Sequence, residues 1–122
     1  MDEENKPYNP LDLKNIGIQL AVRLLHSKEK PLPPKEFKGA GVYAIFYIGR
    51  NPLYAKLGQI NRQYGCSWPI YVGKAVPAGA RKGILAEDQA DDSRALFDRL
   101  CEHAKSIEST ETLTLSDFGA SI

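Results

Sequence analysis

Five side chains of this sequence have types and spacings that could do chemistry. Tyr43 and Tyr71 each lie in a short stretch rich in glycine and β-branched residues, and Lys74 follows Tyr71 by three positions. Arg99 and His103 are four residues apart, which places them on one face of a helix. Phenol and imidazole groups move protons, and guanidinium and ammonium groups bind anions. The rest of the sequence has to position these groups if they are to act together.

Each of these residues also has an ordinary structural interpretation. Tyrosines on neighbouring strands usually pack against each other. Arg99 and His103 fall at one edge of the apolar stripe of the predicted helix, so we expect both to be half-buried where the helix meets the strands. On the pair alone, a boundary arginine and a core-edge histidine are the simpler explanation. The glycine between Tyr71 and Lys74 allows close approach of the backbone, which favours a site.

The charge distribution indicates what such a site would meet. The net charge is only +1, which by itself argues against nucleic acid as a partner. By segment, however, residues 1–37 are neutral, residues 38–86 carry +7 without one acidic residue, and residues 87–122 carry −6. The basic segment also holds five of the six tyrosines and the only tryptophan. Basic groups interleaved with aromatic ones suit a polyanion, although a basic sheet whose acids lie elsewhere is an alternative.

Length and composition define the class of protein. A chain of 122 residues with 43% hydrophobic and 25% charged residues is typical of one globular domain. No apolar run approaches the roughly 20 residues that span a bilayer, and the acidic N-terminus is unlike a signal peptide. We therefore expect a cytoplasmic protein with reduced cysteines and no membrane association. Gly39–Ala44 fits a dinucleotide-binding pattern but opens a strand, so we discard it.

The elements that must position the five side chains follow in the order helix, strand, strand, helix, strand. We predict one helix from about Asp12 to His26, and a second that Asp91, Asp92 or Ser93 can cap and that runs to about Ser109. Strands are predicted over Gly41–Ile48 and Pro69–Lys74. A third strand is predicted to start at Leu113–Leu115. A proline-rich connector follows the first helix, and residues 53–68 read as a polar, tyrosine-rich insertion. The fold class is α+β.

At these residues the sequence resembles the GIY-YIG nuclease superfamily. The first element is Gly41–Tyr43, and the second is Tyr71–Gly73, continued by Lys74-Ala75. Tyr47-Ile48-Gly49 also spells the second motif, but it follows Tyr43 in the same strand, so we do not assign it as the second element. The run Pro69–Gly79 is similar to the type II restriction endonucleases of the superfamily, the branch that cuts GC-rich palindromes. The resemblance covers about residues 37–118.

The resemblance implies a fold and a division of the chain. It implies a small three-stranded antiparallel sheet flanked by helices. Residues 1–36 would form an N-terminal helical extension with a proline-rich linker, and residues 37–122 an incomplete nuclease domain.

The resemblance also implies a reaction, the hydrolysis of a DNA phosphodiester bond by water. Tyr43 would take the proton of the water, helped by His103, and Arg99 would contact the scissile phosphate. Tyr71 would bond a phosphate oxygen or orient the water, and Lys74 would add positive potential. The partner is double-stranded DNA, and a palindromic target predicts a homodimer on the site. Four basic residues are the expected DNA contacts: Lys56, Arg62, Arg81 and Lys82.

The resemblance implies one Mg²⁺ ion, held by a glutamate on a helix after the third strand. We expect that helix to lie beyond residue 122, so no metal ligand is assigned within the chain. The 122 residues alone are then expected to fold marginally and not to cleave DNA. A DNA-binding remnant without catalysis is the main alternative, and a small interaction domain with both tyrosines in its core is the other.

Overall fold

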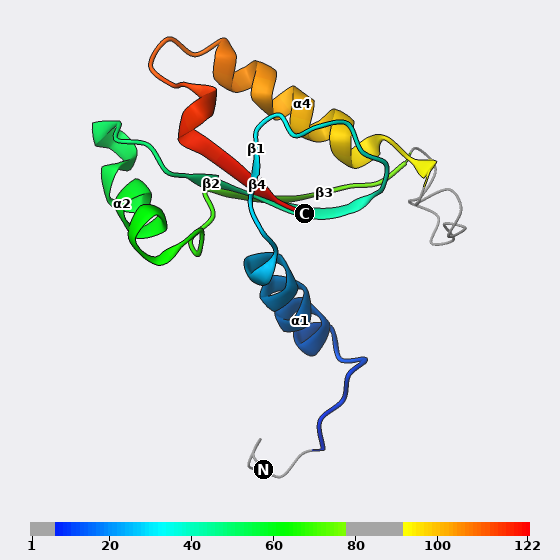
Figure 1. Ribbon diagram of the computed structural model, residues 1–122. Helices are drawn as coiled ribbons and strands as arrows, with labels where there is room; N and C mark the ends of the chain where they lie inside the picture. Colours follow the sequence, from blue (N-terminus) through cyan, green and yellow to red (C-terminus); the bar gives the residue numbers. More distant parts are fainter. Residues whose placement is uncertain (1–6, 78–91) are drawn as a thin grey trace.

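The computed structural model describes residues 7–77 and 92–122, and it confirms the α+β class. Figure 1 shows a sheet with helices on both sides. The helices in these residues are α1 (Leu13–His26), α2 (Ala55–Tyr64) and α4 (Ala95–Glu108). The strands are β1 (Lys30–Pro31), β2 (Gly41–Tyr47), β3 (Tyr71–Ala75) and β4 (Phe118–Ser121).

The sheet has four strands in the order β1-β4-β2-β3, and every pairing is antiparallel. The prediction of three strands was therefore wrong, because Lys30 and Pro31 in the proline-rich connector pair with Ala120 and Gly119. The predicted start of the last strand was also wrong. The Asp117 N–H donates to the Thr114 carbonyl and closes a turn, so the strand begins only at Phe118.

Strand β2 lies between β4 and β3 and carries the core on both of its faces. Tyr43, Ile45 and Tyr47 belong to the cluster that packs under α4, while Ala44 and Phe46 pack with Leu24 of α1 on the other face. The alternation follows from the two-residue period of a strand. These five side chains, consecutive from Tyr43 to Tyr47, are almost completely buried, which makes this part of β2 the rigid centre of the domain.

Helix α4 has the capping and the buried face that its sequence predicts. The Ser93 hydroxyl accepts a hydrogen bond from the Ala95 N–H at 3.0 Å, which satisfies one of the free donors at the start of the helix. Leu96, Leu100 and Ala104 recur at four-residue spacing, and all three are buried against the sheet. The expected apolar stripe is thus confirmed, and it fixes the rotation of α4 over β2 and β3.

Helix α2 occupies most of the segment that the sequence showed only as a polar insertion. Its inner face consists of Gly58 and Asn61 rather than apolar side chains, so the sequence carries no helical hydrophobic period there. The Asn61 amide nitrogen donates to the carbonyls of Tyr47 and Trp68, each at 2.9 Å. Its amide oxygen accepts from two further backbone N–H groups, of Ser67 and Trp68. Asn61 therefore joins α2, β2 and the loop that leads into β3.

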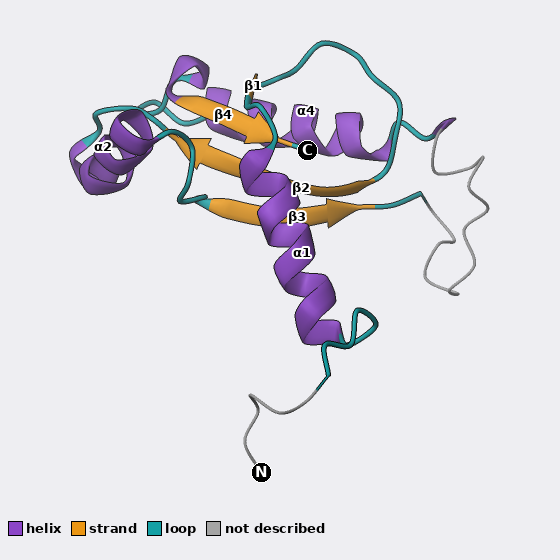
Figure 2. Cartoon of the chain, turned by 60° about the horizontal axis from the view of Figure 1, so that its bottom comes forward, coloured by secondary structure: helices purple, strands orange, loops and turns teal. Residues whose placement is uncertain are grey.

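Helix α1 lies on the side of the sheet opposite to α4 and extends past the edge formed by β3 (Figure 2). The Asp12 carboxylate caps its first turn by accepting a hydrogen bond from the Lys14 N–H. Leu24 is its only buried residue. Within residues 7–77 and 92–122, no helix is both long and apolar enough to cross a bilayer.

Candidate active site

The two motif tyrosines lie side by side on the α4 face of the sheet. Tyr43 pairs across the strands with Gly73, and Ile45 pairs with Tyr71, so the tyrosines are diagonal neighbours on one face. Their rings are stacked, with centroids 6.0 Å apart and planes 28° from parallel. Tyr43 is fully buried, whereas the ring of Tyr71 is 43% exposed. The β2–β3 register therefore sets one phenol in the core and the other at its rim.

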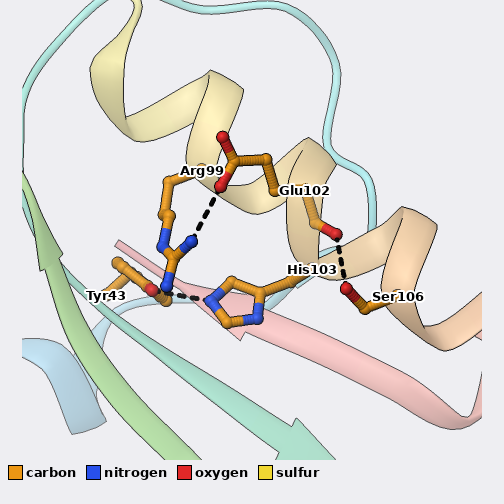
Figure 3. A network of polar contacts seen from close by, with 5 residues as sticks. All are labelled: Tyr43, Arg99, Glu102, His103 and Ser106. Carbon is orange, nitrogen blue, oxygen red and sulfur yellow. Dashed lines mark hydrogen bonds and ion pairs between the residues drawn. The ribbon is translucent and has the colours of Figure 1, made fainter.

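Helix α4 brings His103 and Arg99 to these tyrosines. The His103 Nε2 atom lies 2.7 Å from the Tyr43 hydroxyl oxygen, within hydrogen-bond distance. The imidazole is also close to the Tyr71 ring, at 4.7 Å between centroids. Figure 3 shows the Arg99 guanidinium, one turn earlier on α4, directed at the same Tyr43 hydroxyl. Tyr43, Tyr71, Arg99 and His103 form one group, which we call the tyrosine–histidine cluster.

Gly73 makes room for the cluster. A Cβ atom at this position would lie 2.6 Å from the Tyr43 hydroxyl and 2.9 Å from a ring carbon of Tyr71. Both distances are shorter than a carbon side chain allows. The sequence suggested a close approach at this glycine, and the groups that approach it are the two tyrosine rings. A larger residue at position 73 would not leave room for both rings.

Burial and charge set the protonation states of the cluster. Burial raises the pKa of Tyr43, and the neighbouring Tyr71 hydroxyl adds to this, while Arg99 acts in the opposite direction. Burial, followed by the charge of Arg99, lowers the pKa of His103, against a smaller opposing effect of Glu102. At neutral pH the cluster thus holds a neutral phenol and a neutral imidazole in contact.

The cation of the cluster is held by a carboxylate on its own helix. Arg99 donates to Glu102 at 2.7 Å, and both side chains are largely exposed, at 43% and 64%. The Glu102 carboxylate, followed by the Tyr43 and Tyr71 hydroxyls, keeps the pKa of Arg99 above its usual range. Exposed ion pairs of this kind are weak, so an incoming anion can compete with Glu102 for the guanidinium.

Of the remaining residues proposed from the sequence, the three that the structure describes lie away from the cluster. Lys74 is opposite Val42, which packs on the α1 side, so the strand alternation directs Lys74 to the face that the cluster does not occupy. Lys56 is exposed on α2. Arg62, also on α2, donates to the carbonyls of Ile48 and Gly49 at the end of β2. Two further basic residues, Arg81 and Lys82, lie outside the described residues.

The literal Tyr47–Gly49 motif has a structural role in this chain. Tyr47 is fully buried, and its hydroxyl accepts a hydrogen bond from the Asn51 N–H at 2.7 Å. The sequence interpretation missed Glu102, which pairs with Arg99 of the cluster, and Asn61, which joins α2 to β2. The spacing of Glu102, three residues after Arg99, was a usable signal for an ion pair. Nothing local marks Asn61, because its four partners are backbone groups.

A shallow apolar cavity of about 230 Å³ adjoins the cluster. Tyr71 and His103 form part of its wall, and the other lining side chains are mostly aliphatic or aromatic, including Ile107 and Phe118. The polar cluster therefore borders a surface that can contact the apolar face of a sugar or a base.

The described residues offer no ready site for a metal ion. In residues 7–77 and 92–122, no three His, Cys, Asp or Glu side chains lie close enough together to hold one. The cluster itself consists of two phenols, an imidazole and a guanidinium, and the carboxylate that contacts it, Glu102, is paired with Arg99. This donor set does not suit a hard divalent cation, which prefers several oxygen ligands.

Comparison with known protein families places the chain beside a family of nuclease domains. The family model of the Eco29kI GIY-YIG domain matches residues 35–122, a range that contains all the strands except β1 and all of the tyrosine–histidine cluster. No curated protein matches the chain.

Proposed function

The chain belongs to the Eco29kI GIY-YIG restriction endonuclease family, and on this basis we propose that it binds double-stranded DNA and hydrolyses a phosphodiester bond at the tyrosine–histidine cluster. The observation that carries the proposal is the 2.7 Å contact between the Tyr43 hydroxyl and His103 Nε2, beside the Arg99 guanidinium. It joins a route for a proton to a group that binds a phosphate.

The proton route begins at Tyr43. A phenolate is not available at neutral pH, because burial raises the pKa of this residue. A neutral imidazole can accept at Nε2 while it carries its proton at Nδ1. The Tyr43 O–H then donates to His103, and the free lone pairs of the phenol oxygen can accept from a water molecule. Tyr43 would take the proton of that water as it passes its own proton to His103.

The phosphate would lie against Arg99. A guanidinium binds two phosphate oxygens at once and stabilises the charge that develops on them during attack. Its present partner, Glu102, forms an exposed ion pair, which a doubly hydrogen-bonded phosphate can displace. The Tyr71 hydroxyl, at the exposed rim of the cluster, is placed to donate to a phosphate oxygen or to orient the water.

Members of this nuclease family are generally metal-dependent. When bound, a divalent ion neutralises phosphate charge and assists the leaving oxygen. The donor set of the described residues does not fit such an ion, so the steps above state only what the four side chains of the cluster would do.

The finer features of the substrate are also proposals. The Pro69–Gly79 run supports a GC-rich palindrome, and a palindrome favours two copies of the chain on one site. Lys56 is exposed on α2 and is placed to contact phosphates, since no side-chain hydrogen bond or ion pair within residues 7–77 and 92–122 involves it. Arg62 has only part of its guanidinium available, since it is bonded to two carbonyls of the chain.

The test combines DNA binding with cleavage. Fluorescence anisotropy with a labelled duplex, repeated across a range of salt concentrations, should give affinity that falls steeply with salt. Nicking of supercoiled plasmid with Mg²⁺ measures hydrolysis. Tyr43→Phe and Arg99→Ala should reduce nicking at least about 100-fold, and Tyr43→Phe should leave binding unchanged. Lys105→Ala removes another positive charge from α4, on its far side, and serves as the control.

Three outcomes separate the candidate functions. Nicking that Tyr43→Phe abolishes supports the endonuclease. Salt-dependent binding without nicking supports the alternative, a DNA-binding remnant. Binding that does not respond to salt, or no binding at all, would point to an interaction domain and would overturn the proposal.

A further inference from the structure

The outer side of helix α2 carries a row of polar side chains that we call the α2 ridge. Lys56, Gln59 and Gln63 recur at three- and four-residue spacing, which aligns them along one side of the helix. All three are exposed. Within residues 7–77 and 92–122, no side-chain hydrogen bond or ion pair involves any of them. Exposed amides can bond to water alone, so the surroundings of the α2 ridge decide whether it is a binding surface.

The domain holds α2 firmly from the side opposite to the α2 ridge. At 100° per residue, Gly58 and Asn61 lie about 160° around the helix from the centre of the ridge. Gly58 is buried so close to the end of β2 that a Cβ atom there would collide with the carbonyl of Gly49. Asn61 is buried too and bonds to four backbone groups. These contacts fix the rotation of α2, so the ridge has one orientation, as a recognition surface requires.

The α2 ridge belongs to the stretch of the chain that has no acidic residue. Neither α2 nor any other position from 38 to 86 is an aspartate or a glutamate. A helix face with a cation, amides and no carboxylate is complementary to a polyanion. A protein partner fits less well, because the cores of protein interfaces are apolar and poor in lysine, and the ridge has no apolar member.

We propose that α2 is the recognition helix of this protein, lying in the major groove of the DNA with Gln59 and Gln63 bonded to base edges and Lys56 to a phosphate. The inference rests on the proposed function, because it takes duplex DNA as the substrate. The major groove admits an α-helix. Four residues rise about 6 Å along a helix, or roughly two base-pair steps, so the two amides reach different base pairs.

The chemistry of the amide names the base. A glutamine side chain both donates and accepts, and adenine presents one donor and one acceptor, N6 and N7, in the major groove. The α2 ridge therefore adds A·T pairs to the expected target, within or beside the GC-rich palindrome that the resemblance favours.

The start of α2 borders the tyrosine–histidine cluster. Tyr54, the residue before α2, lines the same apolar cavity as Tyr71 and His103. Figure 1 shows α2 beyond one end of the sheet and α4 along its face. A duplex whose phosphate lies against Arg99 would therefore pass α2 within a few base pairs, which joins base reading to the reacting group.

The test selects bound duplexes from a library with a random central stretch, without added metal, so that binding is measured apart from hydrolysis. The wild-type chain should enrich one sequence motif. Gln59→Ala and Gln63→Ala should each lose the preference at part of that motif and weaken affinity for the selected duplex at least about fivefold. Affinity for a scrambled duplex should not change, because it depends on phosphate contacts.

A change of preference is a stronger readout than a loss. Gln63→Arg should move the preference at its base pair from adenine to guanine, because a guanidinium pairs with O6 and N7 of guanine. Gln19→Ala removes another exposed helical glutamine, on α1, and is the matched control that should select the wild-type motif. Alanine favours the helix, so circular dichroism should show unchanged helical content in the alanine variants.

The outcomes distinguish this assignment from the proposed function. If Gln59→Ala and Gln63→Ala both select the wild-type motif with wild-type affinity, the assignment is overturned. A wild-type chain that binds every duplex equally would also overturn it, while the proposed hydrolysis would stand. A chain that binds no duplex would overturn the recognition helix and the proposed function together.

Discussion

Gly73→Ala should disrupt the candidate site by adding a single methyl group. The added carbon would lie 2.6 Å from the Tyr43 hydroxyl, 2.8 Å from the ring carbon that bears it, and 2.9 Å from the Tyr71 ring. Tyr43 is fully buried and its ring is rigid, so it can move only by displacing the core around it. The hydroxyl would leave its contact with His103.

Two terms give the size of the effect. Overpacking a rigid core costs about 1–3 kcal/mol, and the lost hydrogen bond adds about 1 kcal/mol. A decrease of roughly 3 kcal/mol in the free energy of unfolding corresponds to a fall of about 10 °C in Tm for a domain of this size. A displacement near 1 Å at the reacting group should also lower hydrolysis about 100-fold.

Thermal melts and the nicking assay test both effects. Gly119→Ala is the matched control, because a Cβ on that β4 glycine would meet the Lys30 carbonyl oxygen at 3.6 Å, an ordinary contact. Its Tm should stay within about 2 °C of wild type. Combining Gly73→Ala with Tyr43→Phe removes one clashing atom, so the two losses should be less than additive. A Gly73→Ala variant as stable and active as wild type would refute the reasoning.

Three further perturbations follow from the structure. Burial, followed by the charge of Arg99, lowers the pKa of His103 on folding. The contribution of His103 to stability is therefore complete above the ordinary histidine pKa range, and it is lost as the pH falls through that range. Tm should fall less between pH 7.5 and 5 in His103→Gln than in wild type or in His26→Gln. Asn61→Ala leaves four backbone groups without their side-chain partner. It should reduce the free energy of unfolding in urea by about 3 kcal/mol. A urea unfolding midpoint equal to that of wild type would contradict this. Lys56→Ala should lower the slope of log affinity for DNA against log salt by about 1 without a change in Tm, whereas an unchanged slope would remove Lys56 from the interface.

The parts of the fold that the sequence predicted are those with a strong local signal. The apolar stripe of α4 and the β-branched run of β2 locate their elements within a few residues. The position of Arg99 and His103 at the edge of that stripe placed both beside the strands. Tyr43, Arg99 and His103 lie on elements of this kind, and it was the resemblance to the nuclease superfamily that grouped them with Tyr71.

The parts that the sequence did not predict depend on contacts between distant segments. The β1 strand is two residues long and exists only through its pairing with β4. Helix α2 packs through Gly58 and Asn61, and neither residue contributes to a hydrophobic period. Lys74 was assigned to the site from its proximity in sequence to Tyr71, but the alternation of β3 directs it to the other face.

The position of β2 in the sheet determines when the site can form as the chain is synthesised. Its two partner strands, β3 and β4, are both made later, and β4 runs from Phe118 to Ser121. His103 follows Tyr43 by 60 residues. A nascent chain that has not yet released β4 therefore has an open edge on β2, although all four members of the cluster have already been made. Pairing between such distant segments slows folding, so the core that holds the cluster should become rigid late, only after β4 has paired with β2.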